Sequence, residues 1–419
     1  MTVNQNNSEL LALERAALGK EPADIILSGG DVLNVYTAEI LRQQTVVIKG
    51  ERIAYVGGDR DFPVSEHTQV FDVSGQVLIP GLIDAHCHMD FGLNFAEYTK
   101  YSLPRGTTTI ITECPGAIAV GLEGMRKLLR LFKDSPQRFY ATTPVIALIS
   151  SWRESQDAFS TGDMAELLDY PEILGLGEIY WSRYIDAEKP AGLAELIAKA
   201  RLLGKTVEGH GAGARNRKLA AMAAAGISSC HEPITAEDVR ERLRLGLSTM
   251  IREGSIRREL ENVIKPLVDM GIDLRKGILV SDGVWPEFLI THGHMDFIVR
   301  KAISLGLDPI RAIQMATLNA AEHFNLDRDL GSITPGKFAD IVLVPDLNQL
   351  TAELVICRGR VVGAKGALTS PLAPDIYPEE FLNTVKLAEI TPETFAVPAG
   401  LNGSPVLAME LLTDIVTRS

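Results

Sequence analysis

The sequence predicts an α/β fold in which a TIM-like (β/α)8 barrel is joined to a small β domain built from both ends of the chain. Three observations predict it. Between about residues 77 and 335, eight short apolar runs alternate with helix-length segments, a pattern typical of parallel strands. On both sides of this region, β-rich runs break at Gly and Asp turn residues. The 419 residues, 46% of them apolar and 23% charged, suffice for one large core and a small partner.

The two ends of the chain predict the small β domain. We expect a short helix around Ser8–Leu18 and then hairpins in Asp24–Gly58, where runs such as DIILSGG and TVVIKG end at turn residues. A similar pattern of short β-rich runs that end at Asp and Gly recurs in Ala339–Gly363. The predicted boundaries are 1–76 and 336–370 for the two parts of the small β domain, 77–335 for the barrel, and 371–419 for a connector and the start of a truncated C-terminal region.

The barrel strands are expected at VLIPGLIDAH, TTTIITE, ATTPVIALI, ILGLGE, KTVEGH, GISSCHE, LSTMIRE and GILVSD. Between them, Ala191–Leu203 and Ala214–Ala225 are rich in Ala, Leu and Lys and place apolar residues at helical spacing. From Thr369 onward prolines are frequent and periodicity is weak. We therefore expect an extended connector there, with a short final helix near Leu407–Val416.

Charge and composition exclude several classes of partner. The 41 Lys and Arg residues against 54 Asp and Glu give a net charge of −13, which disfavours binding to nucleic acid or anionic membranes. No apolar run reaches the ~18 residues of a spanning helix, and the polar N-terminus is unlike a signal peptide. The four cysteines are scattered without a CxxC and are expected to be free thiols. We expect a cytoplasmic protein that acts on a small molecule.

Six side chains at the carboxyl ends of the expected strands predict a metal centre. Four of the eight histidines and two carboxylates follow five of the runs, at the end of a barrel where active sites lie. Imidazoles and carboxylates in this number suit two divalent metal ions. The six residues are His86, His88, Glu178, His210, His231 and Asp282.

The residue types indicate the chemistry. His86 and His88 are two residues apart on a strand, so they face the same way and can chelate one ion. The carboxylate of Glu178 can bridge two cations, which together lower the pKa of a shared water. Asp282 can ligate one metal and accept the proton of that water as a general base.

Further candidates follow the same strands. Glu232, next to His231, can contact the substrate or orient its neighbour, and an ordinary loop carboxylate is an equal alternative. Arg252 can orient a polar substrate or pair with Glu253. The other four histidines are expected to be structural or at the surface: His67, His292, His294 and His323. Of these, we retain only His294 as a further candidate site residue.

Two tryptophans lie close after the proposed ligands. Trp181 and Trp285 follow Glu178 and Asp282, and aromatic walls suit a flat heterocycle. We take both as substrate-binding candidates, although packing in the core or at the rim explains them equally well.

The motifs PGLIDAHCH, LGE, EGH, CHE and SD, followed by ITPGKFADIVLV, resemble those of the amidohydrolase superfamily. Within it, AAGISSCHEPITAEDVRERLRLGLSTMIREGS and HMDFIVRKAISLGLDPIRAIQMATLNAAEHFNL closely resemble the bacterial adenine deaminases. The resemblance covers roughly residues 24–370 and is strongest over Gly226–Gly336. It implies a reaction in which metal-activated hydroxide attacks C6 of adenine and expels ammonia.

The resemblance also implies a role for each ligand. It implies a first metal held by His86, His88 and Asp282, a bridge by Glu178, and a second metal held by His210 and His231. Asp282 and Glu232 are the expected catalytic residues. The two ions are expected to be manganese or iron, with zinc also possible. The HxE…PCxxC arrangement of the cytidine-type zinc deaminases does not occur in the chain.

Motifs on the substrate side differ from those of the family. The chain has HMDFG at His88–Gly92 where adenine deaminases read HxHIESS, and ECPGA at Glu113–Ala117 where they read DPHE. Asp282 is followed by Gly283 instead of a second aspartate. We keep Asp90, within the first of these stretches, as a substrate-binding candidate. The residues expected to face the substrate differ from the family, whereas the expected metal ligands are kept. This pattern indicates either a different substrate or sequence changes that leave the activity unaffected.

We therefore expect a metal-dependent hydrolytic deaminase of adenine or a related amino-substituted N-heterocycle, without the family's full C-terminal domain. An alternative is hydrolysis of a cyclic amide, an imide or another C–N bond by the same binuclear centre. A third hypothesis is a non-catalytic homologue that binds a heterocycle or a partner protein. Dimers or larger homo-oligomers are expected, since they are common in the superfamily.

Overall fold

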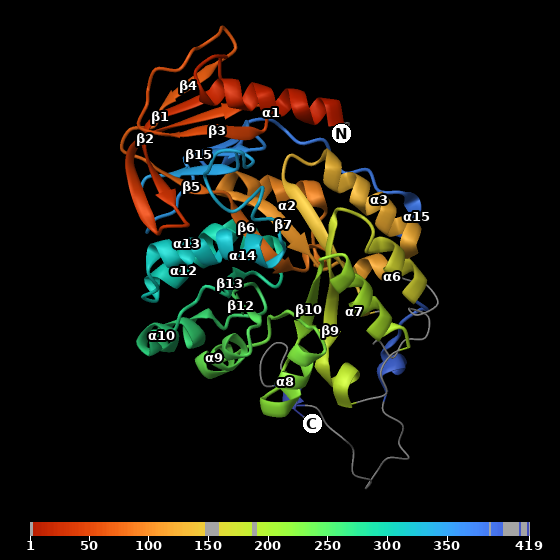
Figure 1. The fold of residues 1–419 in the computed structure, drawn as a ribbon. Helices are drawn as coiled ribbons and strands as arrows, with labels where there is room; N and C mark the ends of the chain where they lie inside the picture. The colour runs from red at the N-terminus through yellow and green to blue at the C-terminus, as the bar shows by residue number, and fades with distance from the viewer. Residues whose placement is uncertain are drawn as a thin grey trace. The chain divides into compact units, whose positions relative to one another are not determined.

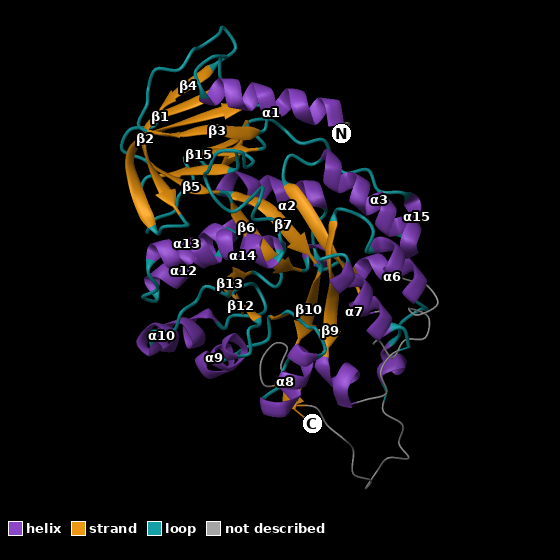
Figure 2. Cartoon of the chain, viewed as in Figure 1, coloured by secondary structure: helices purple, strands orange, loops and turns teal. Residues whose placement is uncertain are grey.

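The computed structural model describes residues 3–146, 159–186, 191–384, 387–396, 410–411 and 417–418. The chain divides into two compact units, Met1–Asp375 and Ile376–Ser419. The first unit contains a nine-stranded, a five-stranded and a three-stranded sheet. Figures 1 and 2 show helices beside these strands. The predicted α/β class is therefore confirmed.

The nine-stranded sheet combines strands from both ends of the first unit. Its N-terminal strands are β1 (Ile25–Asn34), β2 (Glu39–Lys49), β3 (Arg52–Gly57), β4 (Gln69–Asp72) and β5 (Val77–Pro80). Its later strands are β14 (Ile341–Val344), β15 (Leu354–Cys357), β16 (Arg360–Ala364) and β17 (Ala367–Leu368). Strand β5 joins the two groups, because it pairs in parallel with β1 and antiparallel with β14. The helix α1 (Val3–Ala17) lies along this sheet (Figure 1), and its Ala16 belongs to an apolar cluster with Ile26 and Val47 of the sheet.

The first predicted barrel run divides between two sheets. Val77–Pro80 belongs to the nine-stranded sheet, whereas the next strand, β6, begins at Leu82 in the five-stranded sheet. Gly81 connects them where the chain passes very close to Thr108: a Cβ atom at residue 81 would lie 2.2 Å from Thr108 Oγ1. Glycine therefore permits the change of sheet at this point. The domain boundaries at residues 76, 335 and 370 remain predictions.

The two remaining sheets of this unit are parallel throughout, and their strands overlap the eight predicted runs. The five-stranded sheet contains β6 (Leu82–Cys87), β7 (Thr107–Thr112), β8 (Arg138–Pro144), β9 (Ile173–Tyr180) and β10 (Thr206–His210). The three-stranded sheet contains β11 (Ser229–Cys230), β12 (Ser248–Arg252) and β13 (Gly277–Val280). Backbone hydrogen bonds link their edges, from Ser228 N to Val207 O (2.8 Å) and from Asp282 N to His86 O (3.0 Å).

Helices separate the parallel strands along the chain (Figure 2). Their bounds are α2 (Phe95–Ser102), α3 (Gly121–Asp134), α6 (Thr161–Leu167), α7 (Leu193–Leu202), α8 (Asn216–Ala224), α9 (Ala236–Arg244), α10 (Leu260–Met270), α11 (Pro286–Thr291), α12 (Met295–Ser304), α13 (Pro309–Met315) and α14 (Leu318–His323). The helices expected at Ala191–Leu203 and Ala214–Ala225 correspond to α7 and α8. Side-chain caps begin several of them; Thr235, for example, accepts a hydrogen bond from Asp238 N at the start of α9.

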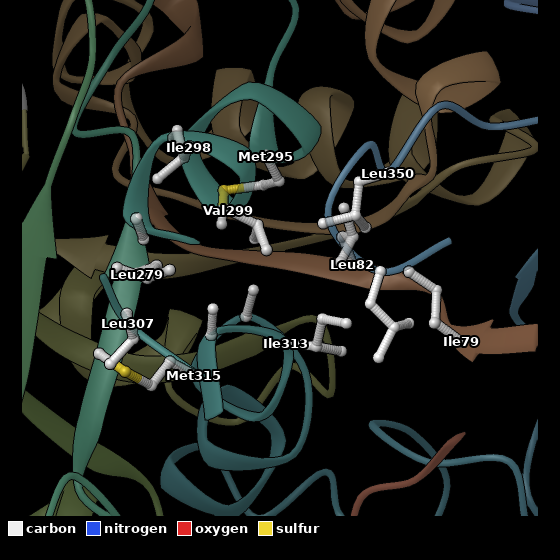
Figure 3. Close-up of a cluster of buried hydrophobic side chains, with 14 of the residues drawn as sticks. Ile79, Leu82, Leu279, Met295, Ile298, Val299, Leu307, Ile313, Met315 and Leu350 are labelled. Atoms are coloured by element: carbon white, nitrogen blue, oxygen red, sulfur yellow. The ribbon is translucent and has the colours of Figure 1, made fainter. Parts of the chain in front are cut away.

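A large apolar cluster connects the nine-stranded sheet to the parallel strands and helices α10, α12 and α13. Ile79, Leu82, Met295 and Ile313 belong to this cluster together with Leu279 of β13, and Leu307 lies beside Met315 (Figure 3). The four cysteines are buried and free, as expected. Among the described residues, no helix is long and apolar enough to cross a membrane.

The second unit contains α15 (Glu379–Leu382), the turn η5 (Pro392–Phe395) and a short antiparallel pair, β18 (Glu410–Leu411) with β19 (Thr417–Arg418). The helix expected near Leu407–Val416 is wrong at Glu410 and Leu411, because these residues pair as a strand. The rest of that predicted helix lies outside the described residues. Apolar periodicity over so short a stretch does not distinguish helix from strand.

Truncation in the apolar cluster should destabilise the first unit. Leu279 is 0% exposed, so Leu279→Ala removes buried methyl groups and leaves a cavity. We expect a loss of about 2–5 kcal/mol in the free energy of unfolding, measured by urea denaturation. Leu202→Ala is the matched control, because Leu202 is 88% exposed; equal effects of the two changes would contradict this account of the core.

Candidate functional site

The structure brings the six predicted ligands together at the carboxyl ends of strands from both parallel sheets. Their positions are His86 in β6 and His88 just after it, Glu178 in β9, His210 at the end of β10, His231 just after β11, and Asp282 just after β13. The parallel strand direction places these ends on one side of the sheets. Residues separated by as many as 196 positions in the chain therefore meet in one site.

The carboxylate of Glu178 lies between two pairs of histidines. Its Oε1 is 3.0 Å from His88 Nε2 and 3.8 Å from His86 Nε2. Its Oε2 is 2.7 Å from His210 Nδ1 and 3.3 Å from His231 Nε2. Each oxygen thus faces one histidine pair, which is the arrangement required of a bridging ligand.

Asp282 completes the side of the site formed by His86 and His88. Its Oδ1 is 3.1 Å from His86 Nε2 and 3.5 Å from His88 Nε2. Its Oδ2 accepts a hydrogen bond from Arg252 Nη1 at 3.0 Å. The φ angle of Asp282 is 54°, in the left-handed region that aspartate tolerates better than most residues. Its position is thus fixed from both the backbone and the side chain.

The donor atoms fit two divalent metal ions that share Glu178. They form three groups in which the ligand atoms lie within 4.8 Å of one another: His86, His88 and Glu178; Glu178, His210 and His231; and His86, His231 and Asp282. Imidazole nitrogens and carboxylate oxygens are ligands for Mn, Fe and Zn alike. The donor set is therefore compatible with each of the expected metals.

Electrostatics keep the two carboxylates ionised. Burial alone would raise the pKa of Glu178, but hydrogen bonds and charge from His231, His210 and His88 lower it well below its usual range. Burial likewise opposes ionisation of Asp282, yet the nearby histidines hold its pKa well below the usual value. Ionised carboxylates are the form that binds cations.

Arg252 organises a second layer of charge beside the ligands. The side chain, only 1% exposed, donates to Glu232 through both terminal nitrogens and to Glu259 Oε1 at 3.2 Å, in addition to Asp282. The predicted alternative pairing of Arg252 with Glu253 is wrong. Successive residues of a strand point to opposite faces, and Glu253 accepts a hydrogen bond from Lys301 instead.

Glu232 lies between Arg252 and the second histidine pair. Its Oε1 is 3.7 Å from His210 Nδ1 and 3.6 Å from His231 Nε2. Burial raises the pKa of Glu232, but the charge of Arg252 and then of the histidines lowers it below the usual value. Glu232 is thus an ionised carboxylate next to the ligands.

The three other substrate-binding candidates have different surroundings. Trp181 is half-buried and donates from Nε1 to Ala212 O at 2.6 Å, so its polar edge holds the loop after β10. Trp285 is 44% exposed and precedes α11. Asp90 Oδ2 accepts a hydrogen bond from Gly116 N at 2.8 Å, while its buried Oδ1 has no hydrogen-bond partner among the described residues.

Glu113, which is not among the predicted site residues, follows β7 and is 4% exposed. Its Oε1 is buried without a hydrogen-bond partner in the described part of the chain. Burial, with the nearby charge of Glu178, raises the pKa of Glu113 to about 7. The sequence does contain the feature that marks the other site residues, a carboxylate at the end of an apolar run. Glu113 ends the run TTTIITE just as Glu178 ends ILGLGE.

Two histidines outside the predicted ligand set are also buried and paired with acids. His294 Nε2 lies 3.0 Å from Asp84 Oδ2, and His323 Nε2 lies 2.9 Å from Glu208 Oε1. The expectation of structural roles for these histidines rested on their position in turns and helices. Their acidic partners are distant in sequence and were not identified.

Known proteins resemble this chain in sequence. A family model described as the amidohydrolase family matches residues 77–362. The chain is 39% identical to the adenine deaminase of Moorella thermoacetica over 98% of its own length and 69% of the relative's. It is 38% identical to adenine deaminase 3 of Rhizobium meliloti, over 91% of this chain and 65% of that protein. The chain thus spans about two thirds of the length of these curated relatives.

A solved structure is similar in fold. The β-aspartyl dipeptidase of Fervidobacterium islandicum AW-1 aligns with a TM-score of 0.61 at 18% identity, over 83% of this chain and 98% of that chain. Identity this low bears on the fold alone. The family match over residues 77–362 and the 39% identity to the Moorella thermoacetica relative show that the chain belongs to the amidohydrolase family.

Proposed function

We propose that the chain is a metal-dependent hydrolytic deaminase of adenine or a closely related amino-substituted N-heterocycle, which releases ammonia. The observation that carries the proposal is the position of Glu178 between two histidine pairs, each reaching a different carboxylate oxygen. The adenine deaminases at 38–39% identity support the choice of substrate.

The proposal includes a closed (β/α)8 barrel. The supporting observation is that both edges of the five-stranded sheet are hydrogen-bonded to the three-stranded one, through Ser228 and through Asp282. Eight parallel strands in two such sheets suit a closed ring. Closure would bring all strand ends that carry the site to one mouth.

The proposed cofactor is a pair of divalent metal ions, manganese or iron, with zinc as an alternative. His86, His88 and Asp282 would hold the first ion and His210 and His231 the second, with Glu178 between them. When bound, such a pair lowers the pKa of a shared water and stabilises negative charge that develops on the substrate.

Asp282 is the proposed proton acceptor. Because its carboxylate is ionised and lies beside both His86 and His88, it can take a proton from the attacking water. The proton would then pass from Asp282 to the leaving amine. Arg252 orients Asp282 through the hydrogen bond to Oδ2.

Glu232 is proposed to accept a hydrogen bond from a ring N–H of the substrate. Its ionised carboxylate can only accept, and Arg252 fixes its orientation from the buried side. Asp90, Trp181 and Trp285 remain proposed contacts to the heterocycle.

One observation favours the second candidate function, hydrolysis of a cyclic amide or imide with ring opening. Asp90 and Glu113 lie in the two stretches that differ from the adenine deaminase motifs, and each keeps a buried carboxyl oxygen without a partner among the described residues. A substrate with a different set of ring N–H and C=O groups would satisfy them. Its product would be ring-opened and free of ammonia.

The direct test is ammonia release from adenine by the Mn-loaded protein. We expect hypoxanthine and ammonia in equal amounts, and a fall of about 10²–10⁴-fold in kcat for Asp282→Asn, because an amide cannot accept the proton. Asp134→Asn, at an exposed position at the end of α3, is the matched control and should keep full activity. A wild-type protein with full metal content that releases no ammonia would exclude the proposal, and a ring-opened product from an imide would favour the alternative.

Metal removal gives a second test. Elemental analysis should find about two ions per chain, and dialysis against a chelator should abolish activity until Mn²⁺ is restored. Because Glu178 faces both histidine pairs, we expect Glu178→Gln to lower the content of both ions. Loss of one ion only would contradict its bridging position.

The pH profile tests the role of Arg252. Arg252 lowers the pKa of Glu232, so Arg252→Met should raise it. If ionised Glu232 is needed, the acidic limb of kcat/KM should move to higher pH. Arg252→Lys, which keeps the charge without the planar fork, should move the limb less. An unchanged limb in a folded, metal-loaded Met variant would contradict this role of Glu232.

A further inference from the structure

Two buried clusters of the same composition lie at the two junctions between the parallel sheets. Each contains a carboxylate from the five-stranded sheet, a serine from the three-stranded sheet or the residue after it, and a histidine from a helix or its N-cap. We name them the Asp84 cluster, formed by Asp84, Ser281 and His294, and the Glu208 cluster, formed by Glu208, Ser229 and His323.

The Asp84 cluster joins β6 to the end of β13. Asp84 Oδ1 accepts hydrogen bonds from the backbone N–H of Ser281 (3.1 Å) and of His86 (3.4 Å). Its Oδ2 accepts a hydrogen bond from Ser281 Oγ and lies 3.0 Å from His294 Nε2. His294 is itself fixed, since its Nδ1 lies 3.0 Å from Thr107 Oγ1. Asp84, Ser281 and His294 are all 0% exposed.

The Glu208 cluster joins β10 to β11 in the same way. Glu208 Oε2 accepts a hydrogen bond from Ser229 Oγ. His323 Nε2 lies 2.9 Å from Oε1 and 3.1 Å from Oε2 of the same carboxylate. Glu208 is 2% exposed and Ser229 is 0% exposed, so this cluster is buried as well.

Each cluster is adjacent in sequence to one pair of proposed metal ligands. Asp84 precedes His86 by two residues and Ser281 immediately precedes Asp282. In the other cluster, Glu208 and Ser229 precede His210 and His231 by two residues each. The Asp84 cluster therefore ties together the chain segments of His86 and Asp282, and the Glu208 cluster ties together those of His210 and His231.

At the two junctions between the parallel sheets, the backbone pairing of neighbouring strands is interrupted. Strands β6 to β10 share one ladder and β11 to β13 share another, while β10 with β11 and β13 with β6 belong to different sheets in the described chain. At both junctions a ligand on one sheet must be held against a ligand on the other. Buried hydrogen bonds to a carboxylate suit this task, since they are short, directional and shielded from water.

We propose that the two clusters position the two halves of the metal centre independently. The Asp84 cluster sets the affinity for the ion at His86 and Asp282. The Glu208 cluster sets the affinity for the ion at His210 and His231. The inference rests on the proposed function only in assuming that the site holds two metal ions. Removing such outer contacts typically weakens metal binding by about 10–100-fold.

The experiment compares three serine-to-alanine variants. Ser281→Ala and Ser229→Ala each remove one hydroxyl from a cluster. Ser102→Ala is the matched control, because Ser102 is also 0% exposed and donates from Oγ to Tyr98 O at 2.8 Å but belongs to neither cluster. The metal-free proteins are titrated with Mn²⁺ by calorimetry and electron paramagnetic resonance, which separates a coupled Mn pair from an isolated ion.

We expect Ser281→Ala and Ser229→Ala each to weaken one of two sites by about 10–100-fold and to convert the coupled signal to that of isolated Mn²⁺. Ser102→Ala should keep both affinities. In a His210→Ala background, which removes a ligand of the second ion, Ser281→Ala should weaken the remaining site and Ser229→Ala should not. Ser281→Thr, which keeps the hydroxyl, should restore affinity relative to Ser281→Ala.

Several outcomes would overturn the inference. Lower unfolding temperatures with two wild-type Mn²⁺ affinities would make the clusters structural only, and equal weakening of both sites by either variant would exclude their independence. A wild-type protein that binds two Mn²⁺ but releases no ammonia from adenine would contradict the proposed function and leave this inference intact. A wild-type protein that binds no Mn²⁺ would overturn both.

Discussion

The carboxylate of Glu178 faces two histidine pairs at once, and the rest of the site depends on this contact. Each of its oxygens lies within about 3 Å of a different imidazole. Because both histidine pairs contact the same small carboxylate group, the two pairs must lie close together. The histidines come from three strands in two sheets. The strands must therefore hold their register to a fraction of an ångström for the site to exist.

A buried ionised carboxylate is costly unless charge and hydrogen bonds compensate it. Glu178 is compensated by the histidines, and Asp282 by histidines on one side and Arg252 on the other. Arg252 in turn is 1% exposed and would be unstable there without Glu232 and Glu259. The charges around the site form one connected set, so altering one member changes the ionisation of its neighbours.

The sequence alone predicts the six proposed ligands, because local signals mark them: a histidine or carboxylate directly after an apolar strand, in the order expected of a ring. It could not identify Asp84 or Glu208, because their partners Ser281 and His323 are 197 and 115 residues away and no local pattern relates them. It also placed Val77–Pro80 with β6, because an apolar run does not record the change of sheet at Gly81. The sequence could not predict contacts between segments that are distant in the chain, because the packing of the folded protein determines which side chains meet.

The division of the ligands between two sheets has a consequence for folding. Of the proposed ligands, His86, Glu178 and His210 lie in the five-stranded sheet and His88 just after it, whereas His231 and Asp282 follow strands of the three-stranded sheet. A group that binds to all of them must bind to both sheets, so its binding energy stabilises the junctions as well as the site. The buried Asp84 and Glu208 clusters act at the same junctions without any bound group. They can therefore hold the ligands near their final positions before an ion arrives, which reduces the ordering that binding would otherwise require.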